Sequence, residues 1–319
     1  MKYFFKRLFI FLVPVLLYIL LVIFIDPYNY FGISKGIVNN EIKRKISYEI
    51  SNPLFELIDF EKTTSPYILL GSSQTGIFTP GIIKEFTGHE FKNMSYGGGT
   101  MPEIISTFWE LDKQTALKEV YIGISFIDFN GSQYRNRIPE ALKTKANYFS
   151  YIFSKSSLKS TLLILQSIIL NSKVAIGKPD MSEDEFWKYQ LDVTANRFYT
   201  NHTYPTGYFE SFKKIAEYCK KKRIKLVFFI PASHVDLQKK TTEFNLLAEE
   251  SKFREDIKKL GDVYDFNYPN EVTKEKNNFS DPFHFKNEIV RTIIDELFNN
   301  RKKISIFSKC ENSSELKQP

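Results

Sequence analysis

The feature that most constrains the fold is an alternation of short apolar runs with helical patterns over residues 67–126 and again over 208–298. The runs are too short for helices and end at turn residues, as buried strands do. Five such runs occur, at 67–70, 90–95, 120–126, 225–230 and 263–266. Strands that alternate with helices form a parallel sheet covered on both faces. The sequence therefore predicts an α/β domain of three layers, α/β/α, around a mainly parallel five-stranded sheet.

Local signals mark where two of the helices begin and end. Thr79 and Pro80 are typical of a helix N-terminus, with Gly88 as its stop. Thr100 and Glu103 form a capping-box pattern that predicts the start of the next helix. The last helix is expected over 287–298, where apolar residues recur at helical spacing.

The N-terminal part predicts a membrane anchor. From Leu8 to Ile25 the sequence carries no charge, and a helix of that length reaches across about 30 Å of hydrocarbon. Lys2, Lys6 and Arg7 precede it, which predicts a cytoplasmic N-terminus and everything after the helix outside. A cleaved signal peptide is the alternative, although the run is longer than usual for one. We therefore expect a single-pass protein of a bacterial cytoplasmic membrane with its catalytic domain outside the cytoplasm.

The predicted organisation has four parts. Residues 1–27 form the cytoplasmic start and transmembrane anchor, and 28–64 form a stalk. Residues 65–300 form the catalytic domain, with an insertion at 131–205 where the strand–helix alternation is lost. The tail at 301–319 is polar and is expected to be disordered.

Composition narrows the kinds of site and partner. Cys219 and Cys310 are the only cysteines in the sequence, so neither a disulfide framework nor a cysteine metal site is expected. The formal net charge is +7, which favours an anionic partner such as lipid headgroups or an acidic glycan, or is simply a solvated lysine-rich surface. No metal, cofactor or nucleic-acid partner is expected.

Chemically useful residues follow the predicted strands at the sheet edge where ligands bind in such folds. The first strand ends in 71–74, Gly-Ser-Ser-Gln, where Ser73 could be exposed as a nucleophile. The second is followed by three glycines at 97–99, whose N–H groups can approach a reacting carbonyl. Asp281 lies three positions before His284 and could orient its imidazole as a general base. Each piece has a structural alternative: an ordinary turn, a flexible loop and a turn cap.

Three other histidines compete with His284 for the role of base. His234 is the main competitor because it follows the fourth predicted strand on the same edge, where it could instead line the substrate pocket. His89 precedes a strand and is expected at the opposite edge, and His202 lies in the insertion without a clear partner.

Taken together, these segments resemble the SGNH (GDSL-like) hydrolase superfamily, which has a flavodoxin-like fold. Residues 71–74 look like its first block, 93–100 like its second, and Asp281 to His284 like its Asp-x-x-His block. The resemblance implies that Ser73 is the nucleophile and contributes its N–H to the oxyanion hole, with Gly98 as the second donor. It implies His284 as base and Asp281 as its support. Gln74 and His234 are expected to bind substrate.

Two positions depart from the family pattern. Ser72 stands where the family has an aspartate before the nucleophile, a substitution associated with relatives that act on surface polysaccharides. Ser125 stands where the third block has an asparagine whose amide donates to the oxyanion. Ser125 could supply a weaker donor, or Asp128 or Asn130 could enter from the following loop.

The resemblance implies ester chemistry, with two outcomes set by the acceptor. With water the protein is a serine esterase, and with a sugar hydroxyl it is an O-acyltransferase acting on a cell-envelope polysaccharide. The N-terminal pattern resembles proteins that work beside a multispanning membrane acyltransferase in glycan O-acetylation, or beside the lipoteichoic D-alanylation machinery. The alternative is a catalytically weakened domain that serves as a glycan-binding or assembly partner of such an acyltransferase.

Overall fold

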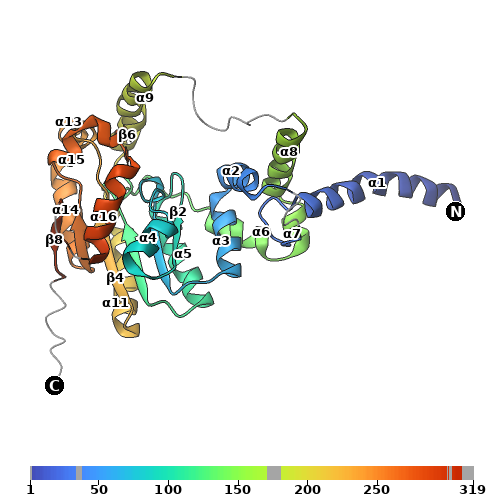
Figure 1. The fold of residues 1–319 in the computed structure, drawn as a ribbon, viewed down its shortest axis with the longest axis horizontal. Coiled ribbons are helices and arrows are strands. Elements are labelled where there is room, and N and C mark those ends of the chain that lie inside the picture. The colour runs from blue at the N-terminus through green and yellow to red at the C-terminus, as the bar shows by residue number, and fades with distance from the viewer. Residues whose placement is uncertain (1, 34–37, 171–180, 300, 302–303, 311–319) are drawn as a thin grey trace. The chain divides into compact units, whose positions relative to one another are not determined.

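The computed structural model describes residues 2–33, 38–170, 181–299, 301 and 304–310 (Figure 1). They belong to two compact units, one made of residues 1–63 and 137–178 and the other of 64–136 and 179–319. The predicted bounds of the stalk, the catalytic domain and its insertion assign functions to segments, and they stay a prediction.

The first unit is helical. Its helices are α1 Lys2–Ile25, α2 Asn40–Ile50, α3 Asn52–Lys62, α6 Ile138–Lys145, α7 Tyr148–Ile152 and α8 Lys155–Ile169. Between α1 and α2 the buried carboxylate of Asp26 accepts the backbone N–H groups of Phe31 at 3.2 Å and Gly32 at 2.8 Å. These two donors give the buried carboxylate the hydrogen-bond partners that a charge needs away from water.

The predicted transmembrane helix is wrong. In the part of the chain that the structure describes, no helix is long and apolar enough to cross a membrane. The uncharged stretch does lie within α1, but apolar residues at its C-terminal end are used in packing. Ile25 is buried in a cluster with Val38, Ile46 and Ile164, and Val22 is fully buried. The predicted location as a single-pass membrane protein is overturned by the same finding.

The second unit holds the sheet. Its strands are β1 Tyr67–Gly71, β2 Phe91–Ser95, β3 Glu119–Gly123, β4 Lys225–Ile230, β5 Asp262–Asp265, β6 Phe279–Asp281, β7 His284–Phe285 and β8 Ile306–Ser308. Its α-helices are α4 Pro80–Thr87, α5 Met101–Gln114, α9 Glu183–Tyr189, α10 Asn196–Thr200, α11 Thr206–Lys222, α12 Val235–Gln238, α13 Lys240–Glu243, α14 Leu247–Lys258, α15 Glu271–Lys274 and α16 Asn287–Asn299. Two 3₁₀ turns, η1 Ser73–Thr75 and η3 Lys276–Asn278, and the π-helix η2 Gln190–Ala195 complete it.

The sheet has the strand order β2-β1-β3-β4-β5-β8. β1 to β5 pair in parallel, whereas β8 pairs antiparallel with β5. The α/β class and the mainly parallel sheet are thus confirmed, but the sheet has six strands and not the predicted five. The sixth strand lies in the predicted disordered tail, of which residues 302–303 and 311–319 are outside the described residues. Three residues at an edge are too few to form a readable alternation.

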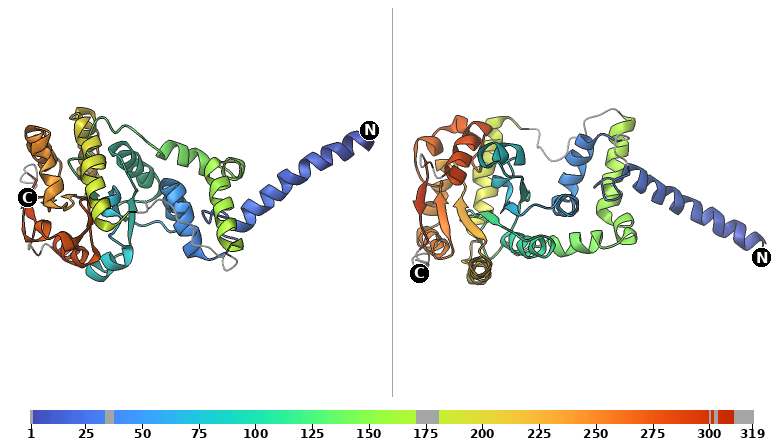
Figure 2. Two further views of the ribbon diagram at one scale, coloured as in Figure 1. Left: turned by 90° about the horizontal axis from the view of Figure 1, so that it is seen from above. Right: turned by 60° about the horizontal axis from the view of Figure 1, so that its bottom comes forward.

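Helices cover both faces of the sheet (Figures 1 and 2). On one face, α4 and α16 pack against each other, and Ile83 and Ile293 join a core with Leu69 and Phe229. The neighbouring residue Phe228 points to the opposite face, as alternation along a strand requires. There its ring meets Phe212 of α11 edge to face at 6.1 Å.

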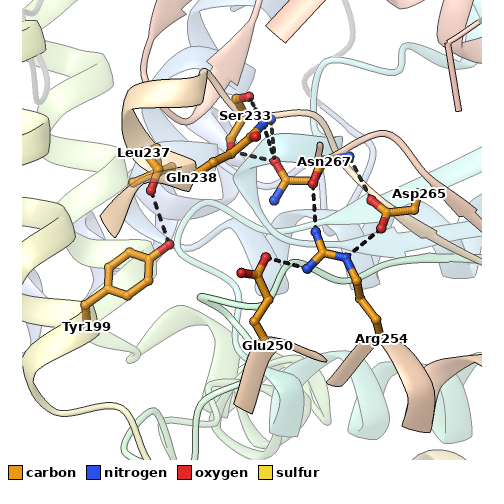
Figure 3. Close-up of polar contacts among 8 residues, drawn as sticks. All are labelled: Tyr199, Ser233, Leu237, Gln238, Glu250, Arg254, Asp265 and Asn267. Atoms are coloured by element: carbon orange, nitrogen blue, oxygen red, sulfur yellow. Dashed lines mark hydrogen bonds and ion pairs between the residues drawn. The ribbon is translucent and has the colours of Figure 1, made fainter. Parts of the chain in front are cut away.

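A polar network fixes the loops that follow β4 and β5 (Figure 3). The Arg254 guanidinium donates to Asp265 Oδ2 at 2.8 Å, to Glu250 and to the backbone oxygen of Asn267 at 2.7 Å. The Asn267 side-chain oxygen accepts the N–H of Ser233 at 3.0 Å and the amide of Gln238 at 3.2 Å. The amide bonds to Asn267 therefore join the two loops to each other, and the stronger charge-assisted bonds of Arg254 join the loop after β5 to α14.

Candidate active site

The turn after β1 is built around Thr75, which is fully buried. Its hydroxyl donates to the backbone oxygen of Ser72 at 2.9 Å and shares a 2.6 Å hydrogen bond with Ser95 Oγ. A Cβ on Gly71 would lie 2.1 Å from Thr75 Oγ1, and one on Gly123 would lie 2.3 Å from Thr75 Cγ2. Glycine at both positions therefore makes room for the threonine that holds the turn.

The glycine loop after β2 lies directly against this turn. Tyr96 N–H donates to the Gly71 oxygen at 3.1 Å, and a Cβ on Gly99 would lie 3.1 Å from the same oxygen. Gly98 has φ +56°, a conformation that glycine adopts without strain. This close approach brings Gly98 and Ser73 to the wall of one cavity.

Ser73, His284 and Asp281 form a hydrogen-bonded chain. His284 Nε2 lies 2.9 Å from Ser73 Oγ, and His284 Nδ1 lies 2.9 Å and 2.8 Å from the two oxygens of Asp281. Asp281 Oδ1 also accepts the backbone N–H groups of Phe283 at 2.8 Å and His284 at 3.2 Å. These donors hold the carboxylate as an acceptor toward Nδ1. The proton then sits on Nδ1, and Nε2 is free to accept the serine proton.

The histidine is carried by a small hairpin outside the main sheet. β6 and β7 pair antiparallel, with Asp281 opposite His284. The Gln74 amide nitrogen donates to the Phe283 oxygen at 3.0 Å and so ties the hairpin to the nucleophile turn. Gln74 is buried, lines the cavity, and leaves its Oε1 without a partner among the described residues.

The cavity at this site has a volume of about 600 Å³. Ser73, His284, Gly98 and Gln74 line it. Neither Ser73 nor Gly98 donates its N–H to another described residue. Two such N–H groups beside a nucleophile can stabilise the oxyanion of an acyl-transfer intermediate.

Asp128 accepts hydrogen bonds from the serine hydroxyls at both positions that depart from the family pattern. Ser72 Oγ donates to Asp128 Oδ2 at 2.7 Å, and Ser125 Oγ donates to the same oxygen at 2.8 Å. Burial raises the pKa of the Asp128 carboxyl, while the two hydroxyls and the neighbouring His284 act against that shift. The Ser125 proton is therefore engaged with Asp128 and does not point to an oxyanion. Sequence reasoning named Asp128 only as an alternative donor, and no pattern signals this bridge.

The remaining candidate residues lie elsewhere. His234 does not line the cavity: its ring meets Trp187 edge to face at 4.9 Å, and its Nδ1 accepts the Asp236 N–H at 3.2 Å. Burial lowers the pKa of His234, so its neutral form caps α12. Asn130 is fully buried, and its amide donates to the Phe198 oxygen at 3.1 Å. His202 packs against Phe126, with ring centroids 4.5 Å apart and the ring planes tilted by 32°.

Two further segments line the cavity, and the motifs of the sequence did not mark them. One is the loop 132–135, and the other is the helix that runs through α9, η2 and α10. Both fall within the predicted insertion at 131–205. Within the described residues, no group of three His, Cys, Asp or Glu side chains is placed to hold a metal ion.

Comparison with known proteins gives limited similarity. No family model matches the chain, and no curated protein matches it. One similar solved structure is a Bacteroides fragilis protein provisionally described as an acylhydrolase, with 13% identity, 73% of this chain and 86% of that chain covered, and a TM-score of 0.37. Another is a Streptococcus pneumoniae protein provisionally described as a platelet activating factor, with 9% identity, 81% and 94% coverage, and a TM-score of 0.38.

Proposed function

We propose that the chain is a serine esterase or O-acyltransferase that forms an acyl-enzyme at Ser73. The observation that carries the proposal is the unbroken chain from Ser73 Oγ through His284 to Asp281, with distances of 2.9 Å and 2.8 Å. It lies in a cavity large enough for a small molecule. A Ser–His–Asp series of hydrogen bonds of this kind activates a hydroxyl that is otherwise a weak nucleophile.

The reaction has two halves. In the first, His284 Nε2 takes the Ser73 proton as Oγ attacks the ester carbonyl, and the N–H groups of Ser73 and Gly98 bind the resulting oxyanion. The oxyanion collapses, the C–O bond to the alcohol breaks, and His284 returns the proton to the departing alcohol. In the second half His284 deprotonates water or an acceptor alcohol, which attacks the acyl-serine and restores the free hydroxyl.

The acceptor decides between hydrolysis and transfer. Polar side chains on the wall, among them Gln190 and Thr194, and the exposed ring of Tyr134 suit a carbohydrate. The resemblance of residues 71–74, 93–100 and 281–284 to SGNH hydrolases points to an O-acylated envelope polysaccharide. A multispanning acyltransferase as acyl donor belongs to the same proposal.

The test is covalent labelling of the full-length chain with a fluorophosphonate. Wild type should be labelled, and Ser73→Ala should not. The matched control is Ser72→Ala, one residue away, which keeps the nucleophile and should still be labelled. Labelling that survives in Ser73→Ala but is lost in Ser72→Ala would move the nucleophile to Ser72. A wild-type protein that is never labelled would favour the binding or assembly module over the enzyme.

A further inference from the structure

An unusual helix forms one wall of the cavity, apart from the segments that carry Ser73, Gly98 and His284. α9, η2 and α10 run without a break from Glu183 to Thr200, and residues 190–195 of this run form a π-helix. π-helical turns are rare and occur frequently at functional sites. The cavity-lining residues Gln190, Thr194 and Arg197 come from this turn or directly after it.

Two arginines on the wall have no carboxylate partner in the part of the chain that the structure describes. Arg197 lies with its guanidinium 5.3 Å from the ring centroid of Phe198 and forms no ion pair with a described residue. Arg135 donates to the Gly98 oxygen at 2.6 Å and likewise forms no ion pair in the described chain. Both line the cavity, and both are exposed.

The same wall carries little negative charge to balance them. Among the described lining residues the one carboxylate is Asp128, whose Oδ2 is occupied by Ser72 and Ser125. The cavity is thus lined by two guanidinium groups and by one carboxyl group, which already accepts two serine hydroxyls. Guanidinium groups bind carboxylate, phosphate and sulfate oxygens through paired hydrogen bonds.

We propose that the cavity selects an acyl ester whose alcohol part carries an anionic group, and that Arg197 and Arg135 bind this group. The proposal rests on the acyl-transfer function above and names the class of its substrate. Arg197 contributes mainly recognition. Arg135 also holds the oxygen of Gly98, so its removal disturbs the glycine loop as well as the charge.

The test compares two acetyl esters that differ by one charge. The substrates are an O-acetylated glucuronic acid and its uncharged methyl ester, assayed with the full-length chain by release of acetate. The ratio of their kcat/KM values is the measured quantity. One charge-assisted contact typically corresponds to a factor of about 10 to 100, so wild type should prefer the acid by that much.

Arg197→Gln should reduce this preference about tenfold or more, and Arg197→Lys should retain part of it because the charge remains. Arg291→Gln is the matched control: Arg291 is exposed, pairs with Glu85 and does not line the cavity, so the ratio should stay at the wild-type value. A wild-type ratio of one, or a ratio that Arg197→Gln leaves unchanged, overturns the proposal.

The experiment separates this failure from failure of the proposed function. If fluorophosphonate labels Ser73 but the two esters are turned over equally, the chemistry stands and the anion selectivity falls. If no ester is turned over, binding of glucuronate and its methyl ester to wild type is compared by calorimetry. Tighter binding of the acid, lost in Arg197→Gln, supports the anion site without catalysis, and equal binding refutes it.

Discussion

Replacing Thr75 by valine tests whether a buried hydroxyl holds the nucleophile turn. Valine keeps the branched shape but puts a methyl group where Oγ1 binds the Ser72 oxygen at 2.9 Å and Ser95 Oγ at 2.6 Å. The methyl cannot approach an oxygen as closely as a hydrogen-bonding hydroxyl does, so the turn must shift. The turn cannot shift toward Gly71, because the Thr75 side chain already fills the space beside the Gly71 Cα.

The expected loss of stability follows from these contacts. Two neutral hydrogen bonds contribute about 1 kcal/mol each, and the clash adds to that loss, so the free energy of unfolding should fall by about 2–3 kcal/mol. Ser73 lies two residues away, and a displacement of about half an ångström should slow its chemistry about tenfold, since about 1 Å costs about 100-fold. Thr75→Ser is the matched control: it keeps the hydroxyl, loses one methyl, and should cost about 1 kcal/mol with nearly normal reactivity.

Urea denaturation and the rate of fluorophosphonate labelling measure the two effects separately. With a slope of about 2 kcal/mol per molar, the valine variant should unfold about 1 M earlier than wild type. The reasoning is refuted if Thr75→Val is as stable as wild type. It is refuted in part if stability falls but the labelling rate does not, because Thr75 would then hold the core without holding the nucleophile.

Three further predictions concern charged groups. Asp281→Asn should lower kcat about 10⁴-fold, because an amide N–H facing His284 Nδ1 forces the proton onto Nε2; an unchanged rate would exclude Asp281 as the orienting group. Burial raises the pKa of the Asp128 carboxyl, so the folded state holds its proton more tightly than the unfolded chain does, and stability is lost as pH rises through the folded pKa. In urea denaturation, the free energy of unfolding of Asp128→Asn minus that of wild type should therefore be larger at about pH 7.5 than at about pH 4. An equal difference at both pH values would contradict this. Arg254→Met leaves the buried Asp265 without its cation at 2.8 Å and should cost about 3 kcal/mol, whereas a loss below 1 kcal/mol would show that the network is not needed for stability.

The parts of the site that the sequence predicts are those set by strand ends. Residues directly after parallel strands meet at one edge, so the segment at 71–74 and the glycines at 97–99 could be placed together before any coordinates. The capping box of Thr100 and Glu103 and the αL stop at Gly88 are also confirmed. They could be predicted because each depends only on residues close in sequence. The Asp281–His284 spacing also restricts the two side chains to one short loop.

What the sequence does not predict depends on contacts between distant segments. The bridge from Ser72 to Asp128 spans 56 positions, and neither residue type signals the other. The pairing of β8 with β5 depends on an edge that exists only after the sheet forms. The apolar run at 8–25 shows the same limit: hydropathy describes composition, whereas the burial of Ile25 against Ile164 depends on a helix far along the chain.

The π-helix at 190–195 has a consequence for how such a protein could diversify. Its i→i+5 bonding accommodates one extra residue inside an otherwise α-helical run. Loss of a single codon there would restore the α-helix and leave the residues after it facing as before, so Arg197 would stay on the cavity wall while the positions of Gln190 and Thr194 within the turn would change. The catalytic serine, histidine and aspartate lie on other segments and would keep their places. A lineage could thus exchange its preference for one alcohol for another through one deletion, without passing through an inactive ancestor.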